Sequence, residues 1–427
     1  MWLNFLKNNV FWNSLYLNLK EFRYLFLFGF IVFVFNIFLE YNHFLNLKEK
    51  KHYLVENALL LQYYPKHNKN NKKYWVLKLK TKDFILYTTS FKDLNLSKNQ
   101  LLNLKIITNN ISFKDYLGKS FYAPSYGFEV LGYLKNNTLI SYFLNQHTNE
   151  KIQEFYGALF FALPISSELR NDVNHYGVAH LIAISGYHIG LLFTLVFFIL
   201  APLYSFFQKR YFPYRSLRFD LSIFIFILLF AYAYLIGFVP SYVRSLIMAL
   251  WGFYLLCKNI KILSFFTLFI SIYLCIVLYP RLLLSIGFFF SCLGVFYIFL
   301  YLHHFSKLFN NFLNIILVNI WTFFCMITPV LYFFPLISYQ QFLAIILSGI
   351  FIVFYPLVLC LHFIAHGNLL DPVLIDFFNL KFYALNIKIP TWALISYLIL
   401  SFIAMRYKIL ALFCIFANFI PFIMIMI

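Results

Sequence analysis

The feature that most constrains this chain is a succession of apolar runs, each about as long as a membrane-spanning helix. A helix of about twenty apolar residues crosses the hydrocarbon core of a bilayer. One run comes early, and from residue 178 onward such runs follow one another with short interruptions. We predict about ten transmembrane helices, at 22–39, 178–207, 220–237, 241–257, 262–279, 282–301, 312–335, 340–363, 391–405 and 409–427.

The composition excludes a soluble globular protein. Of the 427 residues, 62% are hydrophobic and 11% are charged, which leaves too little polar surface to cover a core. The apolar runs are continuous rather than alternating, so they predict a polytopic α-helical membrane protein and not a membrane barrel. The formal charge of +19 favours a polyanionic partner, either phospholipid or nucleic acid. The codon bias of an AT-rich genome is a second explanation, because Phe, Asn, Lys, Ile and Tyr are all frequent.

The chain between the first two predicted helices has the composition of a soluble domain. Residues 1–39 form an N-terminal segment with the first transmembrane helix, and 40–155 form an external domain in which lysines outnumber acidic residues. Within that domain the runs 74–80, 83–89 and 104–109 have the length and apolar content of strands. The sequence therefore predicts a small external β domain.

The rest of the chain divides at the start of the long apolar series. Residues 156–177 are amphipathic and too broken to span, which predicts interfacial helices on the membrane surface. Residues 178–427 then form a multi-helix transmembrane channel domain. Within it the polar segment 364–390 is predicted to be re-entrant or bound to the membrane surface.

The distribution of basic residues predicts an orientation. If 40–155 is external, the basic loop 208–218 faces the cytoplasm, as the positive-inside rule requires, and the uncharged turn 335–340 is external. With ten spans, however, the basic turn 406–408 also falls outside. That turn conflicts with the rule and makes the last two spans the least secure.

One stretch at the start of the long series is unusually polar and reads Ala-His-Leu-Ile-Ala-Ile-Ser-Gly-Tyr-His-Ile-Gly over 179–190. A membrane helix normally excludes polar groups, because lipid offers them no hydrogen-bond partner. Ser185 and His188 would share a helix face, and a Ser-Gly pair is a point where a helix can break. Each residue alone has an ordinary structural explanation, such as a packing glycine or a histidine at the headgroups. The candidate channel residues are His180, Ser185, Gly186, His188 and Gly190, with Arg244 one turn inside a later helix.

This stretch closely resembles the His-Leu-Leu/Ile-Ala-Ile-Ser-Gly-x-His signature of the ComEC competence proteins, with Tyr187 in place of the usual Leu. Upstream, 168–170 matches the Glu-Leu-Arg of the family. Downstream, 237–244 matches its Gly-Phe-x-Pro-Ser-x-x-Arg turn, and 287–291 resembles its Gly-Phe-Gln-Leu-Ser motif with Phe in place of Gln. A further family run is only weakly matched around 347–349.

The resemblance implies a function, because ComEC proteins are inner-membrane channels that carry single-stranded DNA into naturally transformable bacteria. It also implies that 40–155 is OB-like, since Phe113, Tyr116, Leu117 and Ala123 match a family segment there. OB-like barrels bind single strands by aromatic stacking and a basic groove, although a merely solvated surface is the alternative. The chain looks like a short form, without the C-terminal metallo-β-lactamase-like domain of longer relatives. The residues of the external domain that touch DNA cannot be named from the sequence.

The partners implied are single-stranded DNA, membrane lipid and a periplasmic or surface DNA receptor. A cytosolic ATP-driven helicase or translocase is also implied, because the sequence contains no P-loop motif. Whether the protein forms a homo-oligomer stays open. We expect no enzyme activity, catalytic residue or cofactor, and the six cysteines show no zinc-site spacing.

Two other functions remain alternatives to the channel. One is an intramembrane hydrolase with Ser185 as nucleophile and a histidine as base. Ala183 stands where a hydrolase motif has Gly, and His188 lies on the same helix as the serine, and both features weigh against it. The other alternative is a transporter of lipid or polysaccharide precursors. Arg244 would either snorkel to the headgroups or face a wet cavity and bind phosphate.

Overall fold

The computed structural model describes residues 19–67, 71–81, 83–97, 100–118, 120–133, 137–258, 264–380 and 383–426. Residues 1–18 of the predicted N-terminal segment lie outside the described residues. The chain forms two compact units. The β unit contains Leu17–Thr138 and Ile272–Ile286, and the helical unit contains Leu139–Ser271 and Gly287–Ile427.

The β unit is built on a six-stranded sheet with the order β5-β3-β2-β1-β4-β6. Neighbouring strands are antiparallel except β3 and β5, which are parallel. The predicted run 74–80 is confirmed as part of β2, and the runs 83–89 and 104–109 overlap β3 and β4, which begin at Ile85 and end at Ile107 respectively. The elements of this part of the chain are α2 (Leu19–Lys48), β1 (His52–His67), β2 (Lys73–Lys80), β3 (Ile85–Ser90), β4 (Gln100–Ile107), α3 (Phe113–Leu117), β5 (Phe121–Tyr122) and β6 (Ser125–Tyr133).

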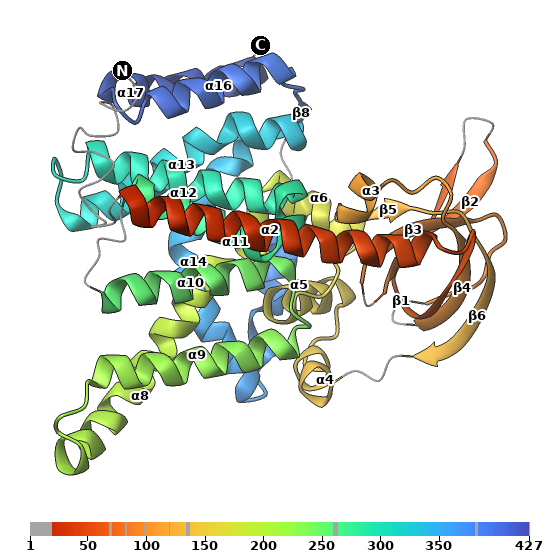
Figure 1. Ribbon diagram of the computed structural model, residues 1–427, viewed down its shortest axis with the longest axis horizontal. Helices are drawn as coiled ribbons and strands as arrows, with labels where there is room; N and C mark the ends of the chain where they lie inside the picture. Colours follow the sequence, from red (N-terminus) through yellow and green to blue (C-terminus); the bar gives the residue numbers. More distant parts are fainter. Residues whose placement is uncertain are drawn as a thin grey trace. The chain divides into compact units, whose positions relative to one another are not determined.

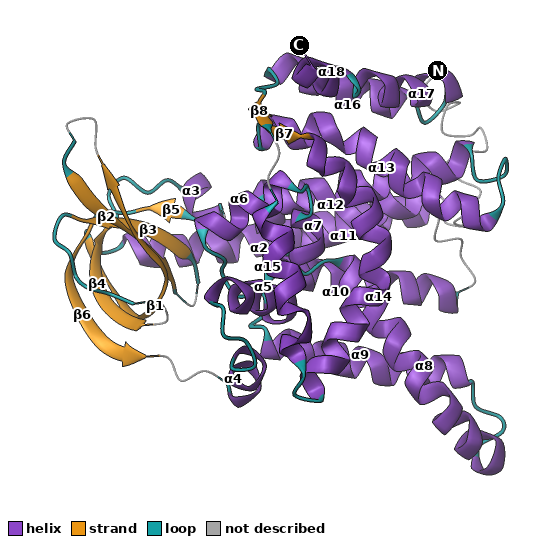
Figure 2. Cartoon of the chain, turned by 180° about the vertical axis from the view of Figure 1, so that it is seen from behind, coloured by secondary structure: helices purple, strands orange, loops and turns teal. Residues whose placement is uncertain are grey.

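The two edges of this sheet meet, so the strands curl around a common core (Figure 2). β5 and β6 are halves of one strand. On one side the Ala123 N–H donates to the carbonyl of Tyr87 in β3, and on the other the Ile107 N–H donates to the carbonyl of Pro124. The hydroxyls of Thr88 and Ser125 are 2.5 Å apart across the junction. Buried side chains fill the interior, among them Leu60, Leu77, Leu79, Leu86, Leu102, Leu104 and Ile106.

The sequence did not predict β1, the longest strand of the sheet. Its first half pairs with β4 and its second half with β2, so it links both sides of the curl. A bulge interrupts it between Val55 and Ala58, where Asn57 has φ +53° and its N–H donates to Asn103 Oδ1 at 2.9 Å. Asn tolerates the left-handed conformation that such a bulge requires. The polar residues at the bulge interrupted the alternation that would have predicted the strand.

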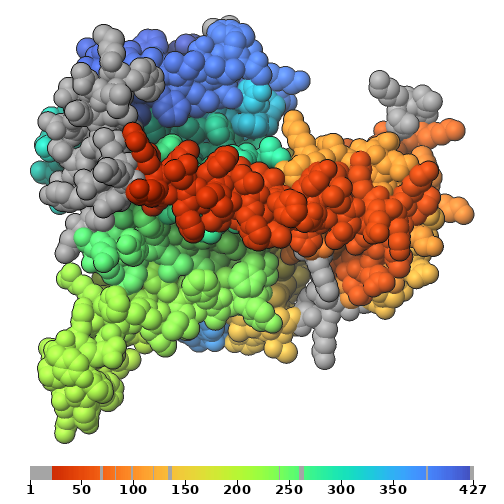
Figure 3. Space-filling model, in the orientation of Figure 1, coloured from red at the N-terminus to blue at the C-terminus, as the bar shows by residue number. Residues whose placement is uncertain are grey.

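The first helix continues past its predicted end at Leu39 to Lys48. Its apolar side chains are exposed along most of its length, and Figure 3 shows them (red) on the surface. Its last turns differ, because Phe44 and Leu47 are buried in the core of the sheet. The predicted boundary at residue 40 therefore falls inside one continuous helix.

Within the β unit, an ion pair joins the turn after α11 (Phe265–Leu278) to α2. Arg281 donates to both carboxylate oxygens of Glu40, at 2.9 and 2.7 Å, and to the carbonyl of Asp83 at 2.6 Å. Its guanidinium also lies 4.8 Å from the ring centroid of Tyr116 in α3. This turn and the sheet therefore lie at the same end of α2.

Every later predicted span is helical in the part of the chain that the structure describes. Six helices of the described chain are long and apolar enough to cross a membrane, and four apolar helices are shorter. The chain is therefore a multi-pass protein, although six of the ten predicted spans have full spanning length. The long ones are Phe22–Lys48, Gly186–Tyr211, Leu217–Leu235, Ile286–His304, Asn311–Phe333 and Tyr339–Phe363, and the short ones are Ser241–Cys257, Phe265–Leu278, Thr391–Ile403 and Lys408–Ile423.

Of the segment 156–177, predicted to form interfacial helices, the part that belongs to α5 is buried in the helical unit. α5 begins at Glu150, inside the range predicted for the external domain, and Phe155, Tyr156 and Phe160 are buried. These residues pack against α7, α14 and α15 in the main core of the helical unit. The remaining elements are α4 (Thr138–Leu144), α5 (Glu150–Phe161), α6 (Ser167–His175), α7 (Ala179–Ile182), α8 (Gly186–Tyr211), α9 (Leu217–Leu235), α10 (Pro240–Cys257), η1 (Pro280–Leu284), α12 (Ile286–His304), α13 (Asn311–Phe333), β7 (Leu336–Ser338), η2 (Tyr339–Phe342), α14 (Leu343–Phe363), η3 (Gly367–Leu370), α15 (Asp371–Asn379), β8 (Ala384–Asn386), α16 (Thr391–Ile403), α17 (Lys408–Ala417) and α18 (Ile420–Met426).

Two short strands pair the chain before α14 with the chain after α15. β7 lies directly before η2 and α14, β8 follows α15, and the two strands pair antiparallel. Figures 1 and 2 agree that β8 lies at one end of the helical unit, whereas the turns after α8, α12 and α16 lie at the opposite end. The chain therefore leaves β7 and returns to the same end of the unit before α16 begins.

Candidate functional site

The polar motif lies where α7 ends and α8 begins. Ser185 has an extended backbone (φ −136°, ψ 178°) and is the N-cap of α8, and its hydroxyl accepts a hydrogen bond from the Tyr187 N–H at 3.3 Å. Three residues on, His188 Nδ1 accepts the Ser185 N–H at 3.3 Å and lies 3.2 Å from Ser185 Oγ. This reciprocal arrangement is a capping box, which supplies partners to the first N–H groups of a helix. The helix breaks at the Ser-Gly pair, as the sequence predicts.

His188 is completely buried. Its ring meets the rings of Phe351 and Tyr355 on α14 edge-on, at centroid distances of 5.3 and 5.1 Å. No carboxylate of the described chain bonds to its Nε2. His188 therefore positions the start of α8 against α14 and does not line an open path.

His180 and Tyr187, by contrast, are exposed, and both contact Ser348 of α14. His180 Nε2 lies 3.3 Å from Ser348 Oγ, and the Tyr187 hydroxyl donates to the Ser348 carbonyl at 2.9 Å. The other ring nitrogen of His180 lies 3.2 Å from the carbonyl of Gly177. Ser348 thus completes the polar surface of the break, although the family resemblance is weak at that position.

Gly186 lies where α8 packs on α10. A Cβ at this position would lie 3.7 Å from Ser245 Oγ and 3.9 Å from Ser245 Cβ, so a methyl group fits at ordinary contact distance. The adjacent Arg244 is 5% exposed, and its guanidinium lies 5.9 Å from the ring centroid of Phe288. Arg244 is therefore inside the helical unit and does not snorkel to its surface.

Two other positions that the sequence singled out, Gly190 and Phe289, take no part in the hydrogen bonds of the break. Gly190 is exposed, and a Cβ there would contact nothing within 4 Å. Phe289, which replaces the Gln of the family motif, packs on the ring of Phe333 at 5.9 Å. The site is thus a capped helix break whose exposed groups are His180, Gly186, Tyr187 and Gly190, with Ser185 half-buried between them.

Sequence reasoning missed a second polar cluster in the helical unit. His147 joins Asp371 and His362, and all three side chains are buried. His147 lies more than 200 positions along the chain from both His362 of α14 and Asp371 of α15. Each is unremarkable by itself, so the single sequence offers no signal for their association.

The outer face of the β unit carries a row of basic and aromatic side chains. Lys78, Tyr87 and Tyr122 are direct cross-strand neighbours on β2, β3 and β5, and they alternate with buried residues. The Lys78 ammonium lies 5.5 Å from the ring centroid of Tyr87, and Tyr122 is 55% exposed. This row offers both of the features that single-stranded nucleic acid binding uses, a cation and stacking surfaces.

A second aromatic pair lies nearby on β1 and β2. Tyr63 stacks on Trp75 at 4.6 Å, and the Lys73 ammonium lies 4.7 Å from the Trp75 ring. The Tyr63 hydroxyl donates to Asp93 Oδ1 at 2.7 Å. Burial and this neighbouring carboxylate raise the pKa of Tyr63 to about 12, and the same bond lowers the pKa of Asp93.

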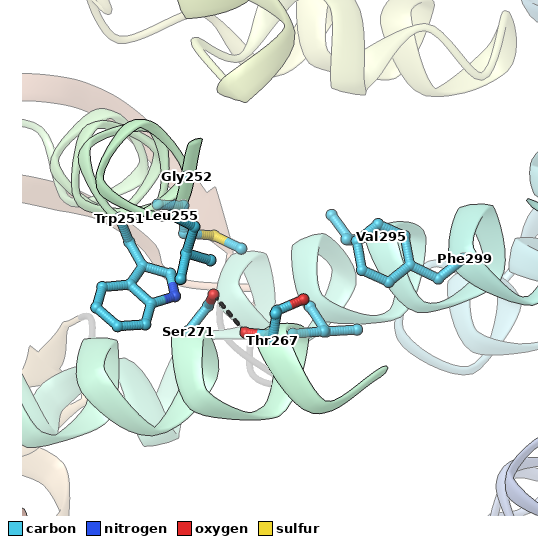
Figure 4. Close-up of a pocket in the computed structure, with 9 residues that line it drawn as sticks. Trp251, Gly252, Leu255, Thr267, Ser271, Val295 and Phe299 are labelled. Carbon is cyan, nitrogen blue, oxygen red and sulfur yellow. Dashed lines mark hydrogen bonds between the residues drawn. The ribbon is translucent and has the colours of Figure 1, made fainter. Parts of the chain in front are cut away.

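The cavities of the helical unit are small and apolar. One of about 130 Å³ lies between α10, α11 and α12, and Figure 4 shows Trp251, Thr267 and Ser271 at its wall. The Ser271 hydroxyl donates to the Thr267 carbonyl at 2.7 Å and so does not present a free polar group there. A second cavity of about 290 Å³ includes Phe160 and Tyr355 in its lining. Neither has the polar lining of a catalytic pocket.

The long apolar helices, with a polar break at the start of one of them, define a multi-pass membrane protein that holds hydrogen-bonding groups inside its helical unit. The family model described as competence protein matches residues 163–426. The chain therefore belongs to the ComEC family of competence proteins, whose role is DNA uptake in transformation. The match includes the capped break and the whole of α8 to α17. No curated protein and no solved structure matches the chain.

Proposed function

We propose that this protein is the inner-membrane channel that carries single-stranded DNA across the membrane during natural transformation. One observation carries the proposal, which is the capped break between α7 and α8. It keeps His180, Tyr187 and Ser348 hydrogen-bonded yet accessible within an otherwise apolar helical unit. A polyanion can pass a low-dielectric layer only along walls that offer such groups.

The β unit supports the same proposal as an OB-like guide for the strand. Counting β5 and β6 as one strand, the sheet order closes on itself as 1-2-3-5-4-1, with the third and fifth strands parallel. That is the connectivity of an OB-like barrel, and such barrels bind oligonucleotides on the face of strands 2 and 3. The row Lys78, Tyr87 and Tyr122 lies on that face and is our candidate for the external DNA-binding surface.

The pairing of β7 and β8 supports a revised membrane topology. α14 has the length of a span, but the return to β8 contains α15, whose nine residues rise only about 14 Å. That is less than half of the roughly 30 Å of a bilayer core. We therefore assign Tyr339–Phe363 as a re-entrant segment that begins and ends on the external side. The basic turn 406–408 then becomes cytoplasmic, and the conflict with the positive-inside rule disappears.

The geometry at Ser185 argues against the hydrolase alternative. A nucleophilic serine needs a base that is itself oriented by a third group. Here His188 Nδ1 accepts the N–H of Ser185, and Ser185 Oγ accepts the N–H of Tyr187, so both groups are engaged in starting α8.

The proposal is tested by substitutions at Gly186, with cytosolic uptake of labelled DNA as the measurement. Gly186→Ala should retain uptake, because its methyl group meets Ser245 at ordinary contact distance. Gly186→Leu should abolish uptake with normal membrane insertion, since its larger side chain would crowd the exposed polar surface of the break beside Ser245. Gly294→Leu is the matched control, because a Cβ at Gly294 contacts nothing within 4 Å. Full uptake by Gly186→Leu would contradict the channel.

A further inference from the structure

A buried chain of three titratable side chains joins separate parts of the helical unit. His147, between α4 and α5, has Nδ1 2.9 Å from both carboxylate oxygens of Asp371 at the start of α15. Its other ring nitrogen lies 2.9 Å from Nε2 of His362, near the end of α14. The ring of His362 closes the chain, since its Nδ1 lies 2.6 Å from the Val358 carbonyl. His147 and His362 are 0% exposed and Asp371 is 8% exposed.

The hydrogen bonds fix how many protons this chain holds. A carbonyl only accepts, so His362 Nδ1 must carry a hydrogen. The contact between the two Nε2 atoms needs one hydrogen, and the contact between His147 and Asp371 needs another. Two neutral histidines supply two hydrogens, so three bonds require one additional proton. With it the cluster as a whole is neutral, either as an imidazolium beside a carboxylate or as a carboxylic acid beside two neutral rings.

Loss of that proton leaves a net negative charge in a buried place. It also leaves two ring nitrogens 2.9 Å apart with no hydrogen between them. Both consequences are unfavourable in a low-dielectric interior. Protonation of the cluster should therefore hold α14, α15 and the α4–α5 turn together.

Among the described residues, no other charged side chain bonds to the three members of this cluster. α5 presents Tyr156, whose ring lies 4.6 Å from the His147 ring and whose hydroxyl has no partner among the described residues. α4 presents Phe143, which stacks on His362, and Gln146, whose amide donates to the His362 carbonyl and accepts the Gly367 N–H. Two charged or titratable groups of these elements are engaged elsewhere: Lys151 binds Asp172, and His366 meets the Ile364 carbonyl.

Packed rings connect this cluster to the capped break. His362 meets Phe160 at 5.1 Å, and Phe160 meets Tyr355 at 5.6 Å. Tyr355 in turn meets His188 of the capping box at 5.1 Å. A shift of α14 on release of the proton would therefore displace the rings that contact His188, and with them the start of α8.

We propose that Asp371, His147 and His362 form a proton-binding site that fixes the packing of α14 and, through it, the conformation of the capped break. The link to DNA transport rests on the proposed function, but proton binding itself does not. The folded protein holds a proton that the unfolded chain releases as the pH rises. Stability must then fall as the pH rises above the ordinary pKa of histidine, about 6.5, because only there do the two unfolded histidines together bind fewer protons than the folded cluster.

The test is the midpoint of thermal unfolding of the purified full-length protein in detergent between about pH 6.5 and pH 8. The wild type should lose stability as the pH rises. Asp371→Asn should lose this dependence, because an amide can donate to His147 and satisfies the chain with two neutral rings. Should that variant not fold, His362→Gln tests the same point, since an amide that donates to His147 also removes the need for the additional proton.

The matched control is Gln146→Met, which removes a non-titrating polar link at the same place. It should lower the unfolding midpoint by a similar amount at every pH and keep the wild-type slope. A wild-type slope in both Asp371→Asn and His362→Gln would overturn the proposal. Loss of the slope in Gln146→Met would overturn it too, because the cluster would then be a structural link only. None of these outcomes depends on DNA uptake, so failure here is distinct from failure of the channel.

Discussion

At the scale of single residues, the polar side chains of the motif supply hydrogen-bond partners to backbone N–H groups. The hydroxyl of Ser185 and the ring of His188 each satisfy an N–H group at the start of α8, where lipid could not. Starting the helix in this way leaves the polar groups of His180 and Tyr187 available beside the break. The importance of Ser185 is therefore expected to lie in its ability to cap.

This role predicts the outcome of two substitutions at Ser185. Ser185→Ala removes the cap and should cost about 1 kcal/mol of stability with reduced but measurable uptake of labelled DNA. Ser185→Asn keeps a side-chain oxygen that caps about as well as serine, so uptake should stay near the wild-type level. A nucleophile would behave differently, since asparagine cannot form the covalent intermediate. Loss of all uptake in Ser185→Asn, with the protein folded in the membrane, would favour the hydrolase.

At the scale of elements, most helices could be predicted from the length of the apolar runs alone. Their packing could not. α5 carries Phe155, Tyr156 and Phe160 in a short run that resembles a surface helix, and only the fold shows that other helices cover it on several sides. Similarly, β1 was hidden by the polar bulge at Asn57, where a local conformational requirement outweighs the alternation of the strand.

The contacts of the site also divide into those that a local sequence pattern predicts and those that only the fold shows. Ser185 and His188 are three residues apart, so their meeting follows from helix geometry. Ser348, Ser245 and the cluster of His147 with Asp371 join the site through contacts between distant segments, which no periodicity in one sequence encodes. The residues that a local pattern brings together were predictable, and those that topology brings together were not.

The re-entrant assignment of α14 makes a prediction at this same scale. A reporter fused after Lys408 should report a cytoplasmic location, like one fused in 212–216, whereas fusions in the 380–388 region should report an external one. The reason is that β7 and β8 pair at the end of the helical unit opposite to the turns after α8 and α16. An external signal after Lys408, together with a cytoplasmic one near β8, would restore Tyr339–Phe363 as a complete span.

At the scale of the whole molecule, the ion pair of Arg281 with Glu40 places the sheet at the end of α2 that also receives the turn after α11. That turn is external in the proposed topology, so the charge pattern and the ion pair agree on an external β unit. The net charge of +19 on the chain suits a polyanion.

Binding of single-stranded DNA by the full-length protein in nanodiscs should therefore depend on salt and on the row Lys78, Tyr87 and Tyr122. Tyr122→Ala should weaken binding by about 1–3 kcal/mol, the usual contribution of one stacked base. Lys78→Gln should reduce the slope of log affinity against log salt by about 0.7, because one phosphate contact is lost.

The matched controls are Tyr126→Ala and Lys105→Gln, a cross-strand pair on the outer face of β4 and β6 that changes the same residue types. These should leave the affinity and the salt slope close to the wild-type values, because neither residue pairs across the sheet with Lys78, Tyr87 or Tyr122. Fluorescence anisotropy of a labelled oligonucleotide at several salt concentrations measures both quantities. Equal effects of the two pairs would mean that the lysines act only through net charge. The β unit would then bind DNA without a defined face.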